Sequence, residues 1–187
     1  PHLHRFHERI RLQGQCVDDA LLLTAFQTIA AAANDVALTF FEFTTLAALW
    51  CFQQQTLDLL VLEVGLGGRL DAVNVVDADV ALITSIGLDH EAWLGSDLNQ
   101  IAQEKAGIMR PGATVVLGDP DIPVVVRQLA LQRRVDCYAI EQNFSLSTLA
   151  LPAHIHPFNF ASARFVFTRL MAVTLTDEQC QRAMAHM

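Results

Sequence analysis

The sequence predicts an α/β protein with a mostly parallel, doubly wound sheet flanked by helices. Nearly continuous apolar runs are typical of strands that are buried on both faces, and four such runs occur, at 57–64, 79–86, 114–117 and 135–140. Helical stretches separate or follow these runs, at 96–106, 122–133, 159–174 and 177–186. Strands that alternate with helices form βαβ units, which build a parallel sheet.

The region before the first predicted strand has a different pattern. The alternation of polar and apolar residues at 9–12 predicts a brief strand or hairpin arm. Asp18 and Asp19 precede an Ala/Leu-rich run, which predicts a capped helix over 19–33. A second helix is expected over 42–55 from the spacing of its apolar residues.

Composition narrows the class of protein further. The 187 residues are 52% hydrophobic and 17% charged, which excludes a disordered chain and fits one domain with a sizeable core. The net charge of −8 argues against a nucleic-acid or anionic-membrane binder, because attraction to phosphate supplies much of that affinity. The chain also lacks a run of the roughly 20 apolar residues that a membrane span needs.

The cysteines indicate the cellular compartment of the protein, and the start of the chain indicates whether it is part of a longer one. Cys16, Cys51, Cys137 and Cys180 are far apart, so a zinc site is not expected, and we interpret them as reduced thiols of the core. This pattern fits a cytoplasmic protein. The chain begins with Pro1 and shows no signal peptide, so we expect it to be part of a longer protein.

Two polar loops follow predicted strands, at 63–74 and 85–90, where ligands bind in parallel sheets. A carboxylate such as Glu63 in an apolar strand must be protonated, paired or bound to a cation, and an ion pair with Arg69 is the simplest explanation. His90 after the next strand is by itself most simply a surface or capping residue. If the two strands are neighbours, however, Glu63 and His90 can share a divalent ion, although Mg²⁺ prefers oxygen ligands.

Other short motifs have ordinary structural explanations. The glycines at 65–68 lack the spacing of a dinucleotide fingerprint, and no GxxxxGK[ST] phosphate loop occurs in these residues. Lys105 is the only lysine and precedes Gly107, a candidate C-cap, so its charge suits the end of a helix. Thr39 and Glu42 have the spacing of a capping box, with phenylalanines that suit a core.

Taken together, several motifs in a fixed order resemble a known family. They are His2-Leu3, Glu8-Arg9, TFFE at 39–42, LEVGLGGRLDAVN at 62–74, TSIGLDH at 84–90, WLG at 93–95, EKAGI at 104–108, and Pro157-Phe158-Asn159 with Ala161. The chain resembles the central part of the bifunctional dihydrofolate synthase/folylpolyglutamate synthase family, within the Mur-ligase-like superfamily. The resemblance is strongest over 39–112 and weak over 119–155.

The resemblance implies an ATP-dependent acid–amino-acid ligase of folate biosynthesis. Such enzymes use ATP and Mg²⁺ to join L-glutamate to dihydropteroate or to the γ-carboxylate of a folate, through an acyl phosphate. The implied fold is the Mur-ligase-like central ATPase domain, and the implied state is a monomer whose partners are these small molecules, neither a nucleic acid nor a membrane.

The resemblance also assigns roles to residues at matching positions. Glu63 and His90 match magnesium ligands, and Lys105 matches a lysine that carbon dioxide carbamylates, which replaces its positive charge with a negative one. Asn159 matches a residue that meets the adenine of ATP. The positions that match contacts to the pterin-bearing substrate are Thr39, Phe40, Phe41, Glu42, Leu70, Asp71 and Ala72.

Departures from the family indicate a partial domain over 1–187. The family's phosphate loop and a magnesium-binding serine would lie upstream of Pro1, and an arginine motif and the C-terminal glutamate-binding domain would lie downstream. We therefore expect the isolated piece to be inactive and poorly folded. Two alternatives stay open: a Mur-type ligase for another acid such as a cell-wall peptide precursor, which the match at 39–42 disfavours, and a non-catalytic remnant, which the missing phosphate loop favours.

Overall fold

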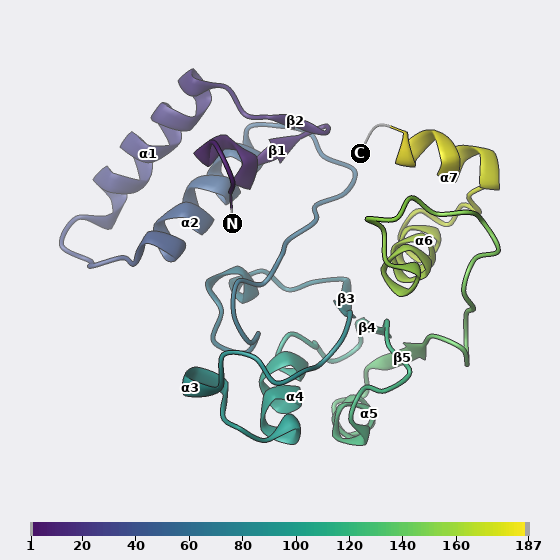
Figure 1. Ribbon diagram of the computed structural model, residues 1–187. Helices are drawn as coiled ribbons and strands as arrows, with labels where there is room; N and C mark the ends of the chain where they lie inside the picture. The colour runs from purple at the N-terminus through teal and green to yellow at the C-terminus, as the bar shows by residue number, and fades with distance from the viewer. Residues whose placement is uncertain (1, 186–187) are drawn as a thin grey trace. The chain divides into compact units, whose positions relative to one another are not determined.

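The structure, a computed structural model, describes residues 2–185 (Figure 1). The chain divides into two compact units, Pro1–Gly65 and Leu66–Met187, and each is described by itself. Within the described residues, no helix combines the length and the apolar character that crossing a bilayer requires.

The first unit joins a small hairpin to two helices. Its elements are the 3-10 helix η1 (Phe6–Arg9), the strands β1 (Arg11–Leu12) and β2 (Gln15–Cys16), and the helices α1 (Asp19–Ala33) and α2 (Phe40–Gln53). The strands β1 and β2 pair antiparallel, which confirms the predicted hairpin, although Arg9 belongs to η1. The Asp18 carboxylate accepts a hydrogen bond from the Leu21 N–H at 2.7 Å, so α1 begins where its capping residue predicts.

A continuous apolar core joins the elements of the first unit. The fully or almost fully buried members are Ile10, Val17, Leu22, Ala25, Ala47 and Cys51. The Phe6 and Phe26 rings meet edge to face with centroids 5.3 Å apart, and this contact joins η1 to α1. Burial of these groups stabilises a unit that contains only two-residue strands.

The second unit contains a three-stranded parallel sheet. Its strands β3 (Val80–Ile83), β4 (Thr114–Leu117) and β5 (Asp136–Ala139) lie in the order β3-β4-β5. The helices α4 (Leu98–Ala106) and α5 (Val124–Gln132) form the crossovers between them. The remaining elements are η2 (Ala72–Val75), α3 (Glu91–Leu94), α6 (Pro157–Met171) and α7 (Asp177–Met184).

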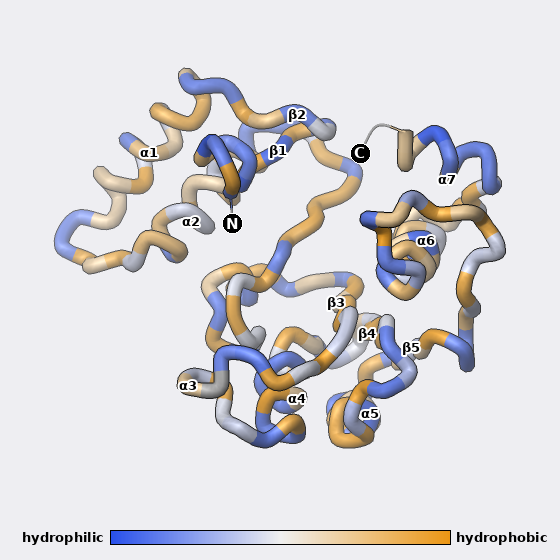
Figure 2. The backbone as a smooth tube through the Cα atoms, in the orientation of Figure 1, coloured by the Kyte–Doolittle hydropathy of each residue, from blue (hydrophilic) through white to orange (hydrophobic). Residues whose placement is uncertain are grey.

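Helices cover both faces of this sheet, which confirms the α/β class (Figure 1). One face packs on α4 and α5 through a shared apolar core that includes Ile83, Val115 and Leu117. On the other face, the Tyr138 ring of β5 lies 5.4 Å from that of Phe165 in α6. Figure 2 shows the resulting pattern, with apolar segments at the sheet and a largely hydrophilic α7.

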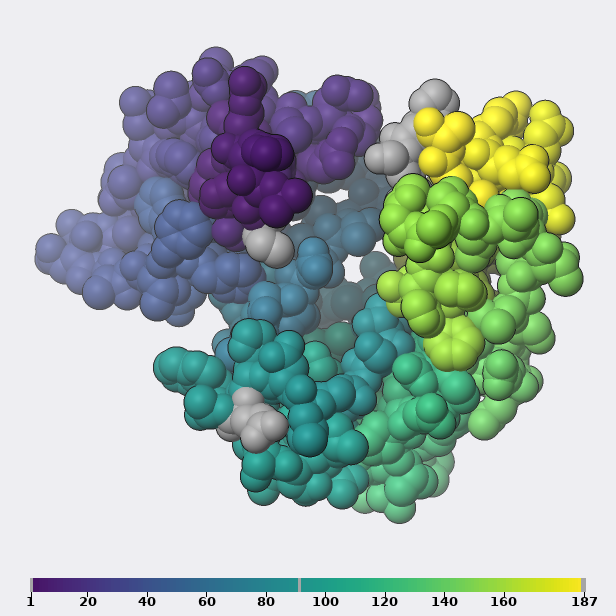
Figure 3. All heavy atoms as spheres, in the orientation of Figure 1, coloured from purple at the N-terminus to yellow at the C-terminus, as the bar shows by residue number. Residues whose placement is uncertain are grey.

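Close packing fixes the position of α6 on the sheet. The Ser162 hydroxyl is fully buried, and a Cβ added at Gly118 would lie 2.7 Å from its Oγ. Only glycine at position 118 therefore allows α6 to approach this closely. The segment before α6 also packs on it, because the Phe144 and Phe165 rings stack with centroids 4.3 Å apart; their regions lie side by side in Figure 3.

One predicted strand is wrong. Residues 57–64 form no regular secondary structure, and the Val61 side chain is 78% exposed. Apolar composition alone does not make a strand, because strand backbone needs a neighbouring chain for its hydrogen bonds, and the described parallel ladder joins only β3, β4 and β5. The predicted run at 79–86 likewise shortens to Val80–Ile83.

The cysteines are all free, as expected, but not all are buried. Cys51 and Cys180 lie in the core, whereas Cys16 is exposed on β2, which corrects its predicted core position. The two-residue strand around Cys16 presents both of its residues to solvent, so no apolar layer covers the thiol. Burial, and then the nearby Asp18 charge, raises the pKa of the Cys51 thiol, and burial also raises that of Cys137.

Candidate functional site

The glycine-rich loop that begins the second unit packs closely on the C-terminal end of α4. A Cβ added at Gly68 would lie 2.9 Å from the Glu104 carbonyl oxygen and 3.1 Å from that of Lys105. A Cβ at Gly107 would lie 2.6 Å from the Arg69 Cα. Glycine at both positions therefore allows the two backbones to meet. The glycines thus have a packing role here, which is different from binding phosphate.

Arg69 joins this loop to α4 through both its backbone and its side chain. Its N–H donates to the Glu104 carbonyl oxygen at 2.9 Å. Its guanidinium donates to the Glu104 carboxylate from Nε at 3.0 and 3.2 Å and from Nη2 at 3.0 Å. The suggested partner of Arg69 was Glu63, and the structure corrects this, because the guanidinium forms its ion pair with Glu104.

Asn74 and Arg110 complete the connection between loop and helix. The Asn74 side-chain amide donates to the carbonyl oxygens of Arg69 at 3.1 Å and of Gly107 at 3.3 Å. Arg110 donates in turn to the Asn74 carbonyl at 2.7 Å and to its Oδ1 at 3.0 Å, and forms an ion pair with Asp77. The loop is thus fixed at both ends by side chains that bond to main-chain atoms.

The three predicted substrate contacts of this loop lie in its middle. Leu70 is 79% exposed, so its apolar side chain is open to a ligand. The Asp71 carboxylate accepts from the N–H groups of Leu66 at 3.0 Å and Val73 at 2.9 Å, which shapes the turn. Ala72 follows as the first residue of η2.

Lys105 lies in the last turn of α4 and is half-buried. The helix ends at Ala106 with Gly107 as its C-cap, as predicted, and its N-cap is Asp97, whose side chain accepts from the Asn99 N–H at 3.2 Å. Glu104 and Gly107 lie on either side of Lys105 in the sequence. The carbonyl oxygens of both accept hydrogen bonds from the glycine-rich loop. The structure therefore brings Lys105 and the predicted contacts at 70–72 onto adjoining segments.

His90 lies on an exposed loop between β3 and α3. Its side chain is 55% exposed, and its Nε2 lies 3.7 Å from Asp89 Oδ2. Its φ of 52° is in the left-handed region, and its carbonyl oxygen accepts from the N–H groups of Trp93 and Leu94. His90 thus directly precedes α3, accepts its first hydrogen bonds, and presents an imidazole to solvent.

The predicted capping box is confirmed at the start of α2. The Thr39 hydroxyl accepts from the Glu42 N–H at 3.2 Å, and the Glu42 carboxylate accepts from the Thr39 N–H at 2.7 Å. The backbone bond from Thr39, and then the bond to its side chain, lower the pKa of Glu42. Phe41 packs on Gly65, whereas Phe40 is 61% exposed, with the Arg9 guanidinium 5.3 Å from its ring centroid.

Glu63 and Asn159 are both exposed. Glu63 lies in the irregular segment of the first unit, so the expected burial in a strand is wrong. Asn159 lies in the first turn of α6, where His156 is the N-cap and Pro157 the first helical residue. Glu63 and the stretch 39–42 belong to the first unit and the other predicted site residues to the second, so their meeting stays a prediction.

The described residues contain no group of three or more His, Cys, Asp and Glu side chains that could hold a metal ion. Mg²⁺ usually keeps several waters and binds through one or two carboxylates and substrate phosphates, so it does not need a larger group of protein ligands. Glu63 presents an exposed carboxylate in the first unit, and His90 presents an exposed imidazole in the second.

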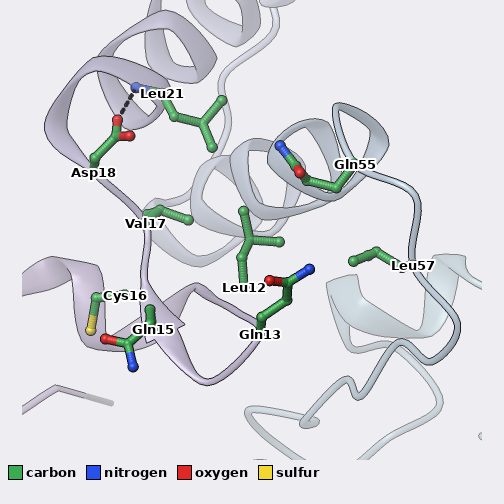
Figure 4. A pocket seen from close by; sticks show the side chains of 9 residues that line it. All are labelled: Leu12, Gln13, Gln15, Cys16, Val17, Asp18, Leu21, Gln55 and Leu57. Atoms are coloured by element: carbon green, nitrogen blue, oxygen red, sulfur yellow. Dashed lines mark hydrogen bonds between the residues drawn. The ribbon is translucent and has the colours of Figure 1, made fainter.

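A separate hollow of 230 Å³ lies in the first unit, between the hairpin and the chain that follows α2 (Figure 4). Its polar lining includes Gln13, Gln15 and Gln55, and Asp18, which already caps α1. None of the predicted site residues lines it.

Sequence reasoning missed Arg110 and gave no role to Asn74 or Glu104. Asn74 and Glu104 lie within the motifs quoted above, so the motifs marked them as candidates. The contacts of these residues join positions 33 to 36 residues apart. Spacing along the chain does not reveal such contacts.

The sequence of the chain is similar to those of several known proteins. No protein-family model matches the sequence. The chain is 48% identical over 153 residues to the dihydrofolate synthase/folylpolyglutamate synthase of Escherichia coli K12, which covers 79% of this chain and 35% of that protein. It is 38% identical over 135 residues to the folylpolyglutamate synthase of Lacticaseibacillus casei, covering 67% of this chain and 32% of that protein.

Solved structures extend the similarity over almost the whole chain. Escherichia coli FolC in complex with DHPP and ADP matches with a TM-score of 0.89 and 37% identity, covering 99% of this chain and 48% of that one. A Yersinia pestis bifunctional folylpolyglutamate synthase/dihydrofolate synthase complexed with AMPPNP and a Mn ion matches with a TM-score of 0.88 and 40% identity, covering 98% and 48%. The chain thus spans about half the length of these solved proteins.

Proposed function

The chain belongs to the dihydrofolate synthase/folylpolyglutamate synthase family, and from that premise we propose that its whole protein is an ATP-dependent ligase of folate biosynthesis. The proposed reaction joins L-glutamate to dihydropteroate or to the γ-carboxylate of a folate. The observation that carries the proposal is the contact between the GGRLDAVN loop and the helix end that presents Lys105. Relatives that are 48% and 38% identical to the chain are named dihydrofolate synthase/folylpolyglutamate synthase and folylpolyglutamate synthase.

The chemistry requires activation of a carboxylate, which is a poor electrophile. Transfer of the γ-phosphoryl group of ATP to a carboxylate oxygen gives an acyl phosphate and ADP. The glutamate amine then attacks the acyl carbon, the bond to the phosphate oxygen breaks, and the nitrogen loses a proton as the amide forms. Both steps pass through strongly anionic transition states, which positive charges and oriented donors stabilise.

Glu63 and His90 are the proposed protein ligands of the divalent ion. Such an ion, when bound, neutralises the charge on the transferring phosphoryl oxygens. The Glu63 carboxylate would supply the oxygen ligand and the His90 imidazole the nitrogen ligand, and both side chains are exposed to solvent. Manganese and AMPPNP are bound in the solved Yersinia protein, which supports ATP and Mg²⁺ as cofactors here.

Lys105 is the proposed organiser of this anionic centre. Its uncharged amine can add to carbon dioxide to give a carbamate, with release of a proton. A carbamate at Lys105 provides two more oxygens for a metal ion or a hydrogen-bond donor. The last turn of α4 holds Lys105 beside the loop that carries Leu70 to Ala72.

The remaining predicted residues bind the substrates. Leu70 to Ala72 and Thr39 to Glu42 are proposed to contact the pterin-bearing substrate, where an exposed ring such as that of Phe40 suits a flat heterocycle. The Asn159 amide is proposed to meet the adenine, because an amide can both donate to and accept from a base edge.

A phosphate-release assay tests the proposal in the full-length protein. We expect release of phosphate only when ATP, L-glutamate and a pterin substrate are all present. Dihydropteroate and tetrahydrofolate are tested separately, because each reports one of the two ligations. Absence of turnover with either substrate would remove the proposal. A muramyl peptide in place of the pterin tests the alternative of a Mur-type ligase for another acid.

The cellular location, the oligomeric state and the partners of the enzyme belong to the same proposal. We place it in the cytoplasm, where thiols stay reduced, because its four cysteines are free. We propose that it acts as a monomer on small molecules, without nucleic acid or membrane. Light scattering after gel filtration of the full-length protein gives the molar mass, and a dimer mass would contradict this.

A further inference from the structure

Arg69 and Glu104 are each adjacent in sequence to a residue with a proposed function. Arg69 precedes Leu70, the first of the substrate contacts, and Glu104 precedes Lys105. We propose that Arg69 and Glu104 are positioning residues, which couple occupation of the loop at 70–72 to the position of Lys105. This inference rests on the proposed function, because it concerns how the same site is assembled.

The contact leaves little freedom between the two segments. The Arg69 N–H bonds to the Glu104 carbonyl oxygen at 2.9 Å, and the side chains bond again at 3.0 to 3.2 Å. Gly68 and Gly107 place the two backbones in direct contact, with no side chain between them. A ligand that orders the loop therefore restrains the main chain at Lys105 as well.

The Arg69–Glu104 ion pair is partly exposed and is held by three side-chain hydrogen bonds. An arginine fork on a carboxylate fixes direction as well as distance. The Glu104 side chain is 28% exposed and that of Arg69 is 53% exposed, so solvent screens the attraction in part. We therefore expect about a fivefold effect for loss of the pair, the upper range for exposed ion pairs.

Three variants of the full-length enzyme test this coupling. In Arg69→Gln and Glu104→Gln, the KM for dihydropteroate should rise about fivefold, and so should the bicarbonate concentration that gives half the maximal rate. Both parameters should return toward the wild-type values in the charge swap Arg69→Glu with Glu104→Arg. A purely structural role would lower the folded fraction and leave both parameters unchanged.

The Arg164–Asp177 pair offers a matched control in the same unit. Its atoms are also 3.0 Å apart and it joins α6 to α7, outside the proposed substrate loop. Asp177→Asn should therefore leave the KM for dihydropteroate and the bicarbonate dependence at wild-type values. An equal rise in that variant would contradict a specific role for Arg69 and Glu104.

Hydrogen exchange of the wild-type enzyme gives a readout that needs no variant. Saturating dihydropteroate should slow amide exchange at 104–108 as well as at 66–72. Protection confined to the loop would overturn the coupling even in an active enzyme. An inactive wild-type enzyme would instead remove the proposed function, so the two failures are distinguishable.

Discussion

Two loops of the second unit flank β3 and differ sharply in how they are held. The loop at 66–74 bonds to α4 through Arg69 and Asn74, and its glycine at position 68 touches the helix backbone. The loop at 84–96 is more open: a Cβ added at Gly87 would meet nothing within 4 Å, and the Trp93 side chain is 81% exposed.

This difference separates a preformed half of the candidate site from an adaptable half. Folding already joins the loop beside Lys105 to α4 by hydrogen bonds, and a bound ligand then restrains loop and helix end together. The loop that carries His90 has fewer buried contacts, and segments of this kind are usually the ones that move on ligand binding. The following predictions test that contrast, from the largest expected effect to the smallest.

Lys105→Ala should have the largest effect, because the preformed half then loses the proposed organiser of the anionic centre. In the full-length enzyme we expect turnover to fall about a hundredfold, similar to the loss when one hydrogen-bond donor to a transition state is removed. The unfolding midpoint should stay near the wild-type value. The exposed neighbour Gln103 on the same helix provides the control Gln103→Ala, which should retain activity. Near-normal rates in Lys105→Ala would show that the carbamate role is wrong.

Gly107→Ala tests the close packing of the first loop. The new Cβ would lie 2.3 Å from the Arg69 Cβ, so the loop or α4 must shift. We expect a loss of about 3 kcal/mol in the free energy of unfolding, measured by urea titration. The matched change Gly87→Ala in the open loop should cost less than about 0.5 kcal/mol. Equal losses in the two variants would contradict the contrast.

Asn74→Ala removes hydrogen bonds from the first loop without introducing bulk. The carbonyl oxygens of Arg69 and Gly107 lose a donor, and Arg110 loses the Oδ1 acceptor. We expect a loss of about 2 kcal/mol in the free energy of unfolding, read from the same urea titration. Asn99→Ala, at an exposed position of α4, is the control and should stay close to wild type.

Trp93→Ala should have the smallest effect, since the ring is largely in solvent already. A change of less than about 0.5 kcal/mol in the free energy of unfolding is expected. The half-buried Trp50 of α2 packs against the core of the first unit, so Trp50→Ala should cost about 2 kcal/mol. A large loss in Trp93→Ala would mean that the open loop is packed in solution.

Local signals in the sequence predicted the elements whose ends are determined by neighbouring residues. The helix at 19–33 has the predicted bounds because Asp18 caps it, and the strand at 114–117 matches its predicted residues. The segment 57–64 has equally apolar residues but is not a strand. Composition shows that a segment can be buried and does not show which chain will pair with it.

The candidate site shows the same limit. Motifs placed Lys105 at the end of a helix beside Gly107, and Thr39 and Glu42 in a capping box, because these features depend on residues within one turn. The partner of Arg69 could not be found in this way, since Glu104 lies 35 residues further along the chain. Charge in the sequence reveals the need for a partner, and only the fold selects it.

The contact of α6 with the sheet has a consequence for how homologous sequences vary. Because the Ser162 hydroxyl occupies the space beside Gly118, a larger residue at 118 fits only if position 162 becomes smaller. The two positions should therefore change together among relatives, one gaining a methyl group where the other loses an atom, so that α6 stays at the same depth above β3 and β4.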